Sequence, residues 1–327
     1  MKRRLGWRTE GNQEGTALPQ ARWAFGLLLF LLLRQEALHA TGGQPVVVVS
    51  YNVENFHIRP YGSRPVKSVE SRTRVAEFLI AIHPDVVALQ EMGEEAALDS
   101  LQSALKEGGL NLPHREHLGG WDTNIFVALL SRFPIVSRLP HTNDSFVLDG
   151  RRFHSSRSTI EVGLEVAPGQ RWTLLTTHLK SKRPVPNADE AELREQEARL
   201  LRGHVDDLLR ENPLMPLIVC GDFNDTPDSK PIRQVIGTGR HALTDTRPAE
   251  PGSSGLEDGE DSKHSRRVTW THFYGQEDTY SRIDYILISR ALKRSWSPQK
   301  SHVFAHPAWG EASDHRPVVC AFEIETP

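Results

Sequence analysis

The sequence has few cysteines, little bias of charge and no apolar run of membrane-spanning length. Two cysteines in 327 residues exclude a disulfide framework and a zinc ribbon. A formal net charge of -3 gives no overall sign of a nucleic-acid binder. With 38% hydrophobic and 25% charged residues, the composition excludes a mostly disordered, collagenous or multi-span membrane protein.

Two motifs of common enzyme classes are also missing. The sequence contains no Gly-x-Ser-x-Gly, the element that presents a serine nucleophile in many hydrolases. It contains no Gly-x-x-x-x-Gly-Lys-Ser/Thr, the phosphate-binding loop of nucleotide-driven motors. A serine hydrolase and a nucleotide-driven motor are therefore both disfavoured.

The first forty residues have the order of a secretory signal. Five basic residues precede an apolar run at 23–33, and small residues follow as far as Ala40. The run of 11 residues is too short to span a bilayer as a helix. We predict that residues 1–40 are a signal peptide or N-terminal export segment, and that the protein is exported to the periplasm or outside the cell. An uncleaved segment that acts as a membrane anchor is the alternative.

The remaining residues, 41–327, are predicted to form a single acidic domain. Residues 1–40 hold six basic and three acidic side chains, so residues 41–327 carry 33 basic and 39 acidic ones and a formal net charge of -6. Residues 248–267, rich in Pro, Gly, Ser and acid, are predicted to be a flexible surface loop. Cys220 and Cys320 lie in apolar segments, which favours buried free thiols. A disulfide between them would need Cα atoms within about 7 Å.

Hydrophobic periodicity predicts more strands than helices. Short β-branched or alternating segments predict strands at 46–51, 85–90, 125–130, 160–166, 172–179, 217–220, 268–274, 283–288 and 318–324. Apolar residues at helical spacing predict helices around 75–82 and 98–105, and a charged helix over 189–210. Because strands and helices do not alternate strictly, the pattern favours strand-rich α/β layers over a doubly wound parallel sheet.

Polar residues that can carry chemistry stand where these strands begin or end. They are Asn52, Glu54, Glu91, His178, Asp222, Asn224, Asp284, Asp314 and His315. Carboxylate and amide oxygens suit Mg²⁺, Mn²⁺ or Ca²⁺ better than zinc. A histidine held by a carboxylate is a candidate base. Together they predict metal-assisted hydrolysis of a phosphate ester, with water as the nucleophile.

Six short motifs occur in a fixed order along the chain. They are Ser50-Tyr51-Asn52-Val53-Glu54-Asn55-Phe56, Leu89-Gln90-Glu91, Thr177-His178-Leu179, Gly221-Asp222-Phe223-Asn224, Arg282-Ile283-Asp284-Tyr285-Ile286-Leu287 and Ser313-Asp314-His315-Arg316-Pro317. The set resembles the endonuclease/exonuclease/phosphatase superfamily, the DNase I-like fold, and with the signal-like N-terminus it is similar to secreted bacterial members. The resemblance implies an α/β fold, a four-layer αββα sandwich of two stacked mixed sheets flanked by helices.

The resemblance also implies a metal site. Glu91 would be the main ligand of a Mg²⁺ or Mn²⁺ ion, assisted by Asn52 and Asp314. Whether one or two ions bind is left open by the residues. The near absence of cysteine agrees with a metal held by oxygen.

The catalytic residues follow from the same motifs. His315 would be the general base or the charged partner of the scissile phosphate, with Asp284 orienting it. Asp222 and Asn224 would align the attacking water and bind a phosphate oxygen. His178 would contact the phosphate or protonate the leaving oxygen. Whether Asp222 or His315 takes the proton of the water stays open.

Basic and aromatic residues offer weaker candidates for substrate binding. Arg157 and Lys180 are predicted to contact the substrate, with solvated basic loops as the alternative. Trp121, Trp270 and Trp309 are candidates for stacking on a base or sugar at the rim of the site, with ordinary packing as the alternative.

Three functions are compatible with these residues. The first is a metal-dependent phosphodiesterase or endonuclease acting on DNA or RNA, although a net charge of -6 weakens it. The second is a phosphatase or phosphodiesterase for a lipid headgroup or small phosphoester. The third is a non-catalytic protein that binds phosphate ligands. We expect a monomer with no obligate protein partner and no stable membrane span.

Overall fold

The computed structural model describes residues 43–251 and 267–324. The predicted export segment, 1–40, and most of the predicted loop at 248–267 lie outside the described residues. Gly43–Pro327 is a compact unit of its own. None of the helices in the described ranges is long and apolar enough to cross a membrane.

The first sheet has six strands in the order β15-β16-β1-β2-β4-β3. Their bounds are β1 (Gln44–Phe56), β2 (Val86–Met92), β3 (His114–Leu118), β4 (Phe126–Ser131), β15 (Trp296–Val303) and β16 (Val318–Ile324). In the middle of the sheet β1 is antiparallel to β16 and parallel to β2. The carboxyl ends of β1 and β2 therefore lie at the same edge.

The second sheet also has six strands, in the order β11-β14-β10-β9-β8-β5. They are β5 (Ile135–Arg138), β8 (Ile160–Ala167), β9 (Gln170–His178), β10 (Leu217–Asp222), β11 (Thr244–Asp245) and β14 (Asp284–Ile288). Two small hairpins lie outside the sheets: β6 (Ser145–Leu148) with β7 (Arg151–His154), and β12 (His272–Tyr274) with β13 (Thr279–Ser281).

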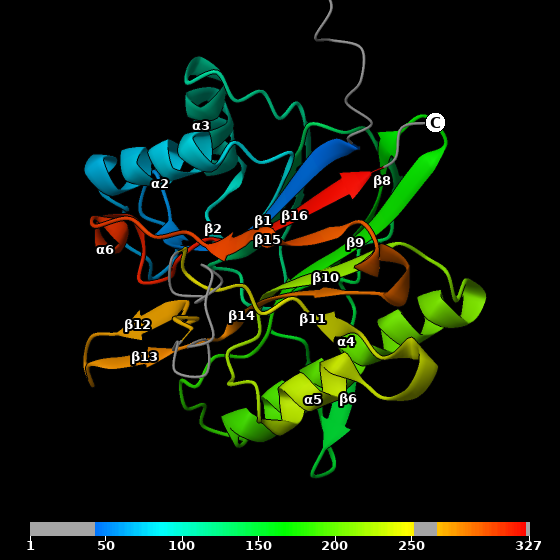
Figure 1. Ribbon diagram of the computed structural model, residues 1–327. Helices are drawn as coiled ribbons and strands as arrows, with labels where there is room; N and C mark the ends of the chain where they lie inside the picture. The colour runs from blue at the N-terminus through cyan, green and yellow to red at the C-terminus, as the bar shows by residue number, and fades with distance from the viewer. Residues whose placement is uncertain (1–42, 252–266, 325–327) are drawn as a thin grey trace, which may run out of the picture. The chain divides into compact units, whose positions relative to one another are not determined.

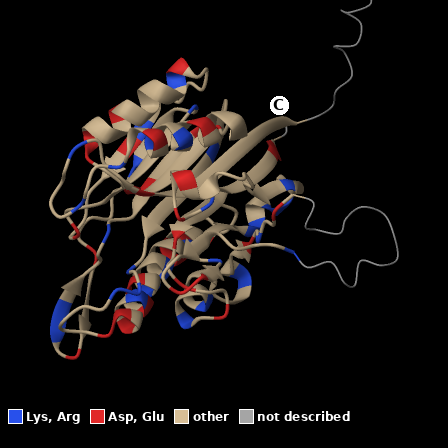
Figure 2. Ribbon diagram, turned by 90° about the vertical axis from the view of Figure 1, so that its left-hand side faces the viewer, with Lys and Arg blue, Asp and Glu red and all other residues tan. Residues whose placement is uncertain are grey.

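Helices cover the outer faces of the two sheets (Figure 1). One side carries α2 (Val69–Ile82), α3 (Glu95–Glu107) and the short α6 (Trp309–Ala312), and the other carries α4 (Glu190–Glu211) and α5 (Lys230–Ile236). Two 3₁₀ turns, η1 (Gly239–His241) and η3 (Arg290–Lys293), complete the described elements. Charged residues are frequent in the helices and loops, whereas the strands between them carry few (Figure 2).

Alternation along each strand divides the core into three apolar layers. Val48 of β1 and Cys220 of β10 point into the layer between the sheets. Their neighbours point the other way, Val49 into the layer under α2 and α3, and Val219 into the layer under α4 and α5. Because successive side chains of a strand point to opposite faces, buried runs of this kind need a covering layer on each side. The predicted four-layer αββα sandwich is confirmed.

The sequence prediction located the main elements but misplaced some of their ends. β1 continues to Phe56 and β2 to Met92, so Asn52, Glu54 and Glu91 lie inside strands and not after them. The strand predicted at 268–274 is only His272–Tyr274. The edge strands, the hairpin strands other than β12, and the helices α5 and α6 were not predicted, because these segments of two to eight residues carry too little apolar periodicity to be distinguished from loops.

Both cysteines are buried free thiols. Cys220 and Cys320 belong to the apolar layer between the sheets. Burial raises the pKa of each thiol to about 12. The thiolate, which is the reactive form, is therefore suppressed, and the interpretation of both residues as packing residues agrees with the structure.

Candidate active site

Three neighbouring strands of the second sheet place a histidine and two aspartates in register. Asp222, the last residue of β10, pairs with His178 at the end of parallel β9 and with Asp284 at the start of antiparallel β14. All three side chains are buried. Gly221 precedes Asp222 with φ +141°, and a Cβ there would overlap the carbonyl oxygen of Thr177. Glycine is therefore required for β9 and β10 to approach each other here.

His315 connects the two aspartates. Its Nδ1 lies 2.8 Å from Asp284 Oδ2, and its Nε2 lies 3.8 Å from Asp222 Oδ2. His178 Nε2 lies 3.4 Å from that same Asp222 oxygen. Ser313 fixes the loop, because its hydroxyl accepts from the His315 backbone amide at 3.0 Å and donates to the Asn52 carbonyl at 2.8 Å. The motifs from both ends of the chain thus meet at Asp222.

Burial and mutual charge separate the pKa values of these groups. Burial lowers the pKa of His315, but Asp284 and Asp222 outweigh it and hold that pKa well above its usual value. Burial, followed by the charge of Asp284, raises the pKa of Asp222 to about 7. The pKa of His178 is well below its usual value because of burial and then of Arg157 and His315. Near neutral pH the site therefore combines a protonated histidine, a neutral histidine and a carboxyl group that titrates.

The parallel strands β1 and β2 are irregular where they carry the predicted metal ligands. The pairing of β1 with β2 shifts register between Asn52 and Phe56, and that of β2 with β4 shifts between Leu89 and Met92. Glu54 and Glu91 have φ of +45° and +57°, a region that non-glycine residues rarely occupy. A bulge of this kind turns a side chain out of the strand alternation, and here it brings Glu91 to the mouth of the site.

Carboxylates crowd this end of the first sheet. The pKa of Glu54 is raised by burial and next by the charge of Asp314, with Glu91 adding to it and Lys67 opposing it. Asp314 also lies 3.7 Å from His272 Nε2 and 3.8 Å from His315 Nε2. Clustered oxygen donors that repel one another fit a divalent cation, because the cation relieves the repulsion. Glu91 and Asp314 are the residues that would hold it.

Asn52 has two hydrogen-bond partners of its own. Its amide nitrogen donates to Asp222 Oδ2 at 3.0 Å, and its amide oxygen accepts from the Glu54 backbone amide at 3.0 Å. Asn52 therefore links the end of the first sheet to the Asp222 carboxyl in the second. Its role as a metal ligand stays a prediction.

A single cleft of about 610 Å³ collects most of the predicted residues. Seven of the ten line it, namely Glu91, Arg157, His178, Asp222, Asn224, Asp314 and His315. Asn52 and Asp284 do not line the cleft, but Asn52 hydrogen-bonds to Asp222 and Asp284 hydrogen-bonds to His315. Lys180 lines an adjoining cavity of about 350 Å³ together with Arg157. The structure thus brings nine of the ten to one site and the tenth to its neighbour.

The two basic residues predicted to bind substrate also have structural partners. Arg157 is buried, with Nη2 3.5 Å from Asp122 Oδ2. The Lys180 ammonium donates to the carbonyl oxygens of Ser181 and Arg183, both at 2.9 Å. Burial lowers the pKa of Lys180, and Arg157 adds to this effect. Substrate contact by either residue stays a prediction.

Of the three predicted rim tryptophans, one is exposed beside the cleft. Trp121 is 60% exposed and stacks on His154, with ring centroids 3.8 Å apart, at the adjoining cavity. Trp270 packs edge-on against Trp309, and the Arg316 guanidinium lies 3.9 Å from its ring centroid. Trp270 and Trp309 are therefore packing residues.

Sequence reasoning missed His272 and Arg64. His272 lines the cleft, with its ring centroid 4.5 Å from that of His315. Arg64 lines both cavities and donates to Asn55 Oδ1 at 2.8 Å. His272 lies in a segment that was predicted to be a strand. Its residue type, a histidine in a strand, was the one sign in the sequence that it could belong to the site. Arg64 lies in the loop after β1, where nothing distinguished it from a solvated basic residue.

Comparison with known proteins identifies the family of the chain. A family model, the Endonuclease/Exonuclease/phosphatase family, matches residues 49–315. The chain belongs to this family. Members of the endonuclease/exonuclease/phosphatase family hydrolyse phosphate esters and generally use divalent metal ions, and the chain carries clusters of acidic and histidine residues suited to such ions. A search of the curated proteins finds no match to this sequence.

Solved structures share the fold at low sequence identity. The human Nocturnin catalytic domain with bound sulfate is 19% identical, with a TM-score of 0.58 over 85% of this chain and 94% of that one. Truncated Caenorhabditis elegans TDP2 is 18% identical, with a TM-score of 0.59 over 87% and 100%. Sphingomyelinase C from Streptomyces griseocarneus is 20% identical, with a TM-score of 0.58 over 86% and 100%.

Proposed function

We propose that this protein is a divalent-metal-dependent phosphodiesterase that cleaves nucleic acid with an activated water. One observation carries the proposal. Asp222, with a pKa near 7, lies in one cleft between neutral His178 and protonated His315, next to the oxygen ligands Glu91 and Asp314. These are the parts that hydrolysis of a phosphodiester by water requires.

The metal ion belongs at Glu91 and Asp314, with Asn52 beside them. Oxygen donors at this position favour Mg²⁺ or Mn²⁺. When bound, such an ion neutralises charge on the phosphate and polarises its phosphorus–oxygen bonds. The protein groups then bind and orient the substrate and move the protons.

Asp222 is the general base of the proposed reaction. Its pKa of about 7 lets it ionise near neutral pH, and its Oδ1 accepts from the Asn224 backbone amide at 2.9 Å, which orients the carboxyl. His315 keeps its proton beside Asp284 and provides positive charge for the phosphate as negative charge builds up. Neutral His178 has no spare proton to give, so its ring N–H would donate a hydrogen bond to the phosphate, and protonated His315 is the group that can give a proton to the leaving oxygen.

The surroundings of the cleft support a polynucleotide as substrate. The adjoining cavity is lined by four basic residues, Arg64, Arg157, Lys180 and Arg183, and by exposed Trp121. Basic groups attract the phosphate backbone, and an exposed aromatic ring provides a surface on which a base can stack. This local cluster offsets the negative charge of the domain as a whole.

A substrate panel tests the proposal. We expect hydrolysis of DNA or RNA and of bis-p-nitrophenyl phosphate with Mg²⁺ or Mn²⁺, and loss of activity with EDTA or in Glu91→Ala. Preference for p-nitrophenyl phosphate or sphingomyelin over nucleic acid would contradict the nuclease assignment. Activity that resists EDTA would contradict the metal mechanism, and inactivity on every substrate would favour a phosphate-binding protein.

We also propose that the chain is exported and acts as a monomer. The basic, apolar and small-residue order of residues 1–40 supports export. Fractionation of cells expressing the full chain and a version lacking residues 1–40 tests export, and the mass measured by light scattering tests the monomer. Retention of both forms in the cytoplasm would contradict export.

A further inference from the structure

A second cluster of metal-binding side chains lies apart from the active-site cleft. His141 and Asp144 stand in the connection between β5 and β6, and His204 stands on α4. None of the three lines the cleft or the adjoining cavity. We propose that His141, Asp144 and His204 bind a transition-metal ion of the Zn²⁺ class in a structural site. This inference does not depend on the reaction proposed above.

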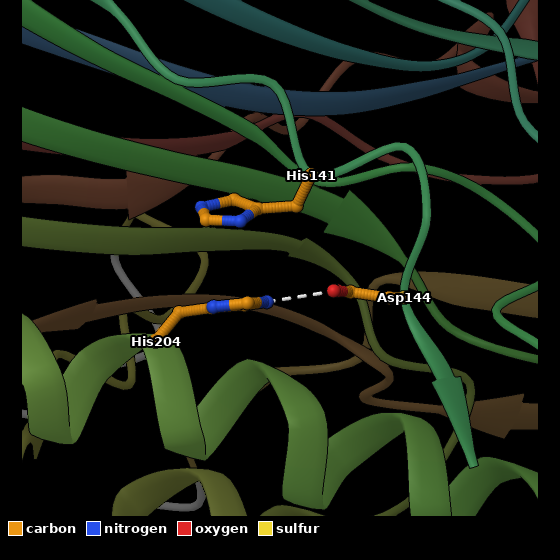
Figure 3. Close-up of side chains that lie close together, drawn as sticks. All are labelled: His141, Asp144 and His204. Carbon is orange, nitrogen blue, oxygen red and sulfur yellow. Dashed lines mark hydrogen bonds and ion pairs between the residues drawn. The ribbon is translucent and has the colours of Figure 1, made fainter.

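His204 and Asp144 point toward each other, and the His141 ring lies over that of His204 (Figure 3). His204 Nε2 lies 2.8 Å from Asp144 Oδ2, and the two imidazole rings stack with centroids 3.7 Å apart. One ligand atom from each residue lies within 4.8 Å of the others. Ligands of a tetrahedral ion with bonds of about 2.0–2.1 Å lie about 3.3 Å apart. Because the nitrogen lone pairs of stacked imidazoles lie in separate planes, one of the two rings has to rotate out of the stack for both to bind the same ion.

The backbone holds the two loop ligands in place. The His141 amide donates to the Thr159 carbonyl at 3.0 Å, and the Asp144 carbonyl accepts from the Ser155 amide at 2.9 Å. His204 belongs to the middle of a helix of 22 residues. The ligands therefore come from fixed segments, which lowers the entropic cost of ordering them around an ion.

Glu161 completes the arrangement. Its Oε2 lies 2.8 Å from His141 Nε2, which leaves Nδ1 as the nitrogen of His141 that an ion would take. A histidine that binds metal through one nitrogen and donates the other to a carboxylate is a recurring feature of protein zinc sites. The His141, Glu161, His204 and Asp144 side chains are 13%, 11%, 19% and 17% exposed, so water can provide the fourth ligand.

Two imidazoles and one carboxylate favour zinc over the ion of the active site. Imidazole suits Zn²⁺ and its neighbours in the first transition row, whereas Mg²⁺ prefers oxygen ligands alone. Three protein ligands plus water also satisfy a tetrahedral ion. The chain would then hold two ions of different chemistry at two separate places.

An ion at this site would join the β5–β6 connection to α4. The same helix carries Glu197, whose carboxylate accepts from the backbone amides of Ser156 at 2.8 Å and Lys180 at 2.6 Å. These two segments border the cavities described above. A bound ion would therefore stabilise the helix that positions them, which is a structural role and not a catalytic one.

The test measures Zn²⁺ binding to the full chain after removal of metals with EDTA and dialysis. Bound Zn²⁺ is counted by equilibrium dialysis, and the rise in Tm on adding Zn²⁺ is measured. The same protein loaded with Co²⁺ is examined for the visible absorption of tetrahedral cobalt. The variants are His141→Gln, His204→Gln and Glu161→Gln, with His114→Gln on β3 as matched control and Glu91→Gln to remove the main ligand of the active-site ion. Glutamine at 204 keeps a donor for Asp144, which protects the fold.

We expect His141→Gln and His204→Gln each to lose one bound Zn²⁺, the tetrahedral cobalt signal and the rise in Tm. Glu161→Gln should weaken Zn²⁺ binding by about 10- to 100-fold. His114→Gln and Glu91→Gln should keep all three signals. Equal Zn²⁺ counts in wild type and His204→Gln, or no tetrahedral cobalt signal in Glu91→Gln, would overturn the proposal and leave two ordinary histidine–carboxylate pairs.

Discussion

At the scale of single residues, the proposed reaction depends on the contacts that His315 makes with two aspartates, Asp284 and Asp222. Asp284 bonds His315 directly at 2.8 Å, whereas Asp222 lies 3.8 Å away with His178 on its other side. The charge of Asp284 acts on both neighbours, because it raises the pKa of His315 and that of Asp222. In the proposed reaction, Asp284 would therefore be a positioning residue that sets the pH range in which an ionised Asp222 and a protonated His315 coexist.

Asp284→Asn tests this arrangement through the pH dependence of kcat/KM. In wild type, activity should rise as Asp222 ionises near pH 7 and fall where His315 loses its proton. Removing the charge of Asp284 lowers both pKa values, so both limbs should move to lower pH by about 1–3 units. The profile is measured on bis-p-nitrophenyl phosphate at constant metal, with Asp228→Asn as surface control. An alkaline limb that stays in place would show that His315 acts without its proton.

His178 should contribute to turnover more than to folding. It is neutral because burial and Arg157 lower its pKa, and it lies 3.4 Å from the proposed base. We expect His178→Asn to reduce kcat by about 10²- to 10³-fold, the usual effect of losing one hydrogen-bond donor to the transition state. Circular dichroism should show a folded protein, and His114→Asn should keep full activity. A loss confined to KM would indicate that His178 binds substrate without assisting the chemistry.

At the scale of elements, the site depends on strands that end irregularly or approach unusually closely. Glu54 and Glu91 occupy positive φ at the ends of β1 and β2, and Gly221 allows β10 to meet β9 just before Asp222 and His178. Strained backbone of this kind persists because the surrounding sheets hold it. The irregular strand ends thus place the side chains of the candidate site, and the backbone at Glu54 and Glu91 is locally strained as a result.

Two glycine-to-alanine substitutions test two different effects on stability: the close approach of β9 and β10 at Gly221, and helix propensity at Gly203 on α4. In Gly221→Ala the new Cβ meets the Thr177 carbonyl, so we expect a loss of about 1–3 kcal/mol in the free energy of unfolding, and lower kcat. Gly203 on α4 has nothing within 4 Å of an added Cβ, so Gly203→Ala should gain about 0.5–1 kcal/mol. Urea unfolding measures both. An unchanged Gly221→Ala would mean that β9 and β10 can separate freely.

At the scale of the whole molecule, charge is distributed unevenly around the cleft. Residues 41–327 carry a net charge of -6, yet four basic side chains line the cavity beside the active site. Attraction between that cavity and a polyanion is local, and salt should weaken it steeply. A small substrate that occupies only the catalytic cleft should not sense it.

Trp121→Ala tests whether the adjoining cavity binds a base. Stacking on an aromatic ring contributes about 1–3 kcal/mol per base, so kcat/KM on single-stranded nucleic acid should fall by about tenfold or more. Hydrolysis of bis-p-nitrophenyl phosphate should stay unchanged, because that substrate carries no base. Leu214→Ala, an exposed apolar residue elsewhere, is the control. Equal losses on both substrates would place Trp121 in support of the cleft itself.

The sequence by itself determined the family, the layered α/β fold and most of the residues of the candidate site. Short apolar runs located the central strands, because buried strands such as β10 and β16 consist mostly of core residues. The six motifs identified Glu91, His178, Asp222 and His315 as parts of one site, and the structure places all four in one cleft. These features depend on short segments of the chain or on the order of its motifs, so the sequence alone is enough to predict them.

Only the tertiary structure decided which of these groups touch, and what their charges are. Asn52 meets Asp222 across 170 residues, and His141 lies beside His204 because the connection between β5 and β6 lies next to α4. The positive φ of Glu91 is invisible in the sequence, because glutamate carries no signal for it. The pKa of Asp222 follows from burial next to Asp284, which exists only once β10 and β14 have paired. Contacts between distant segments are set by packing of the whole core, and local sequence does not encode them.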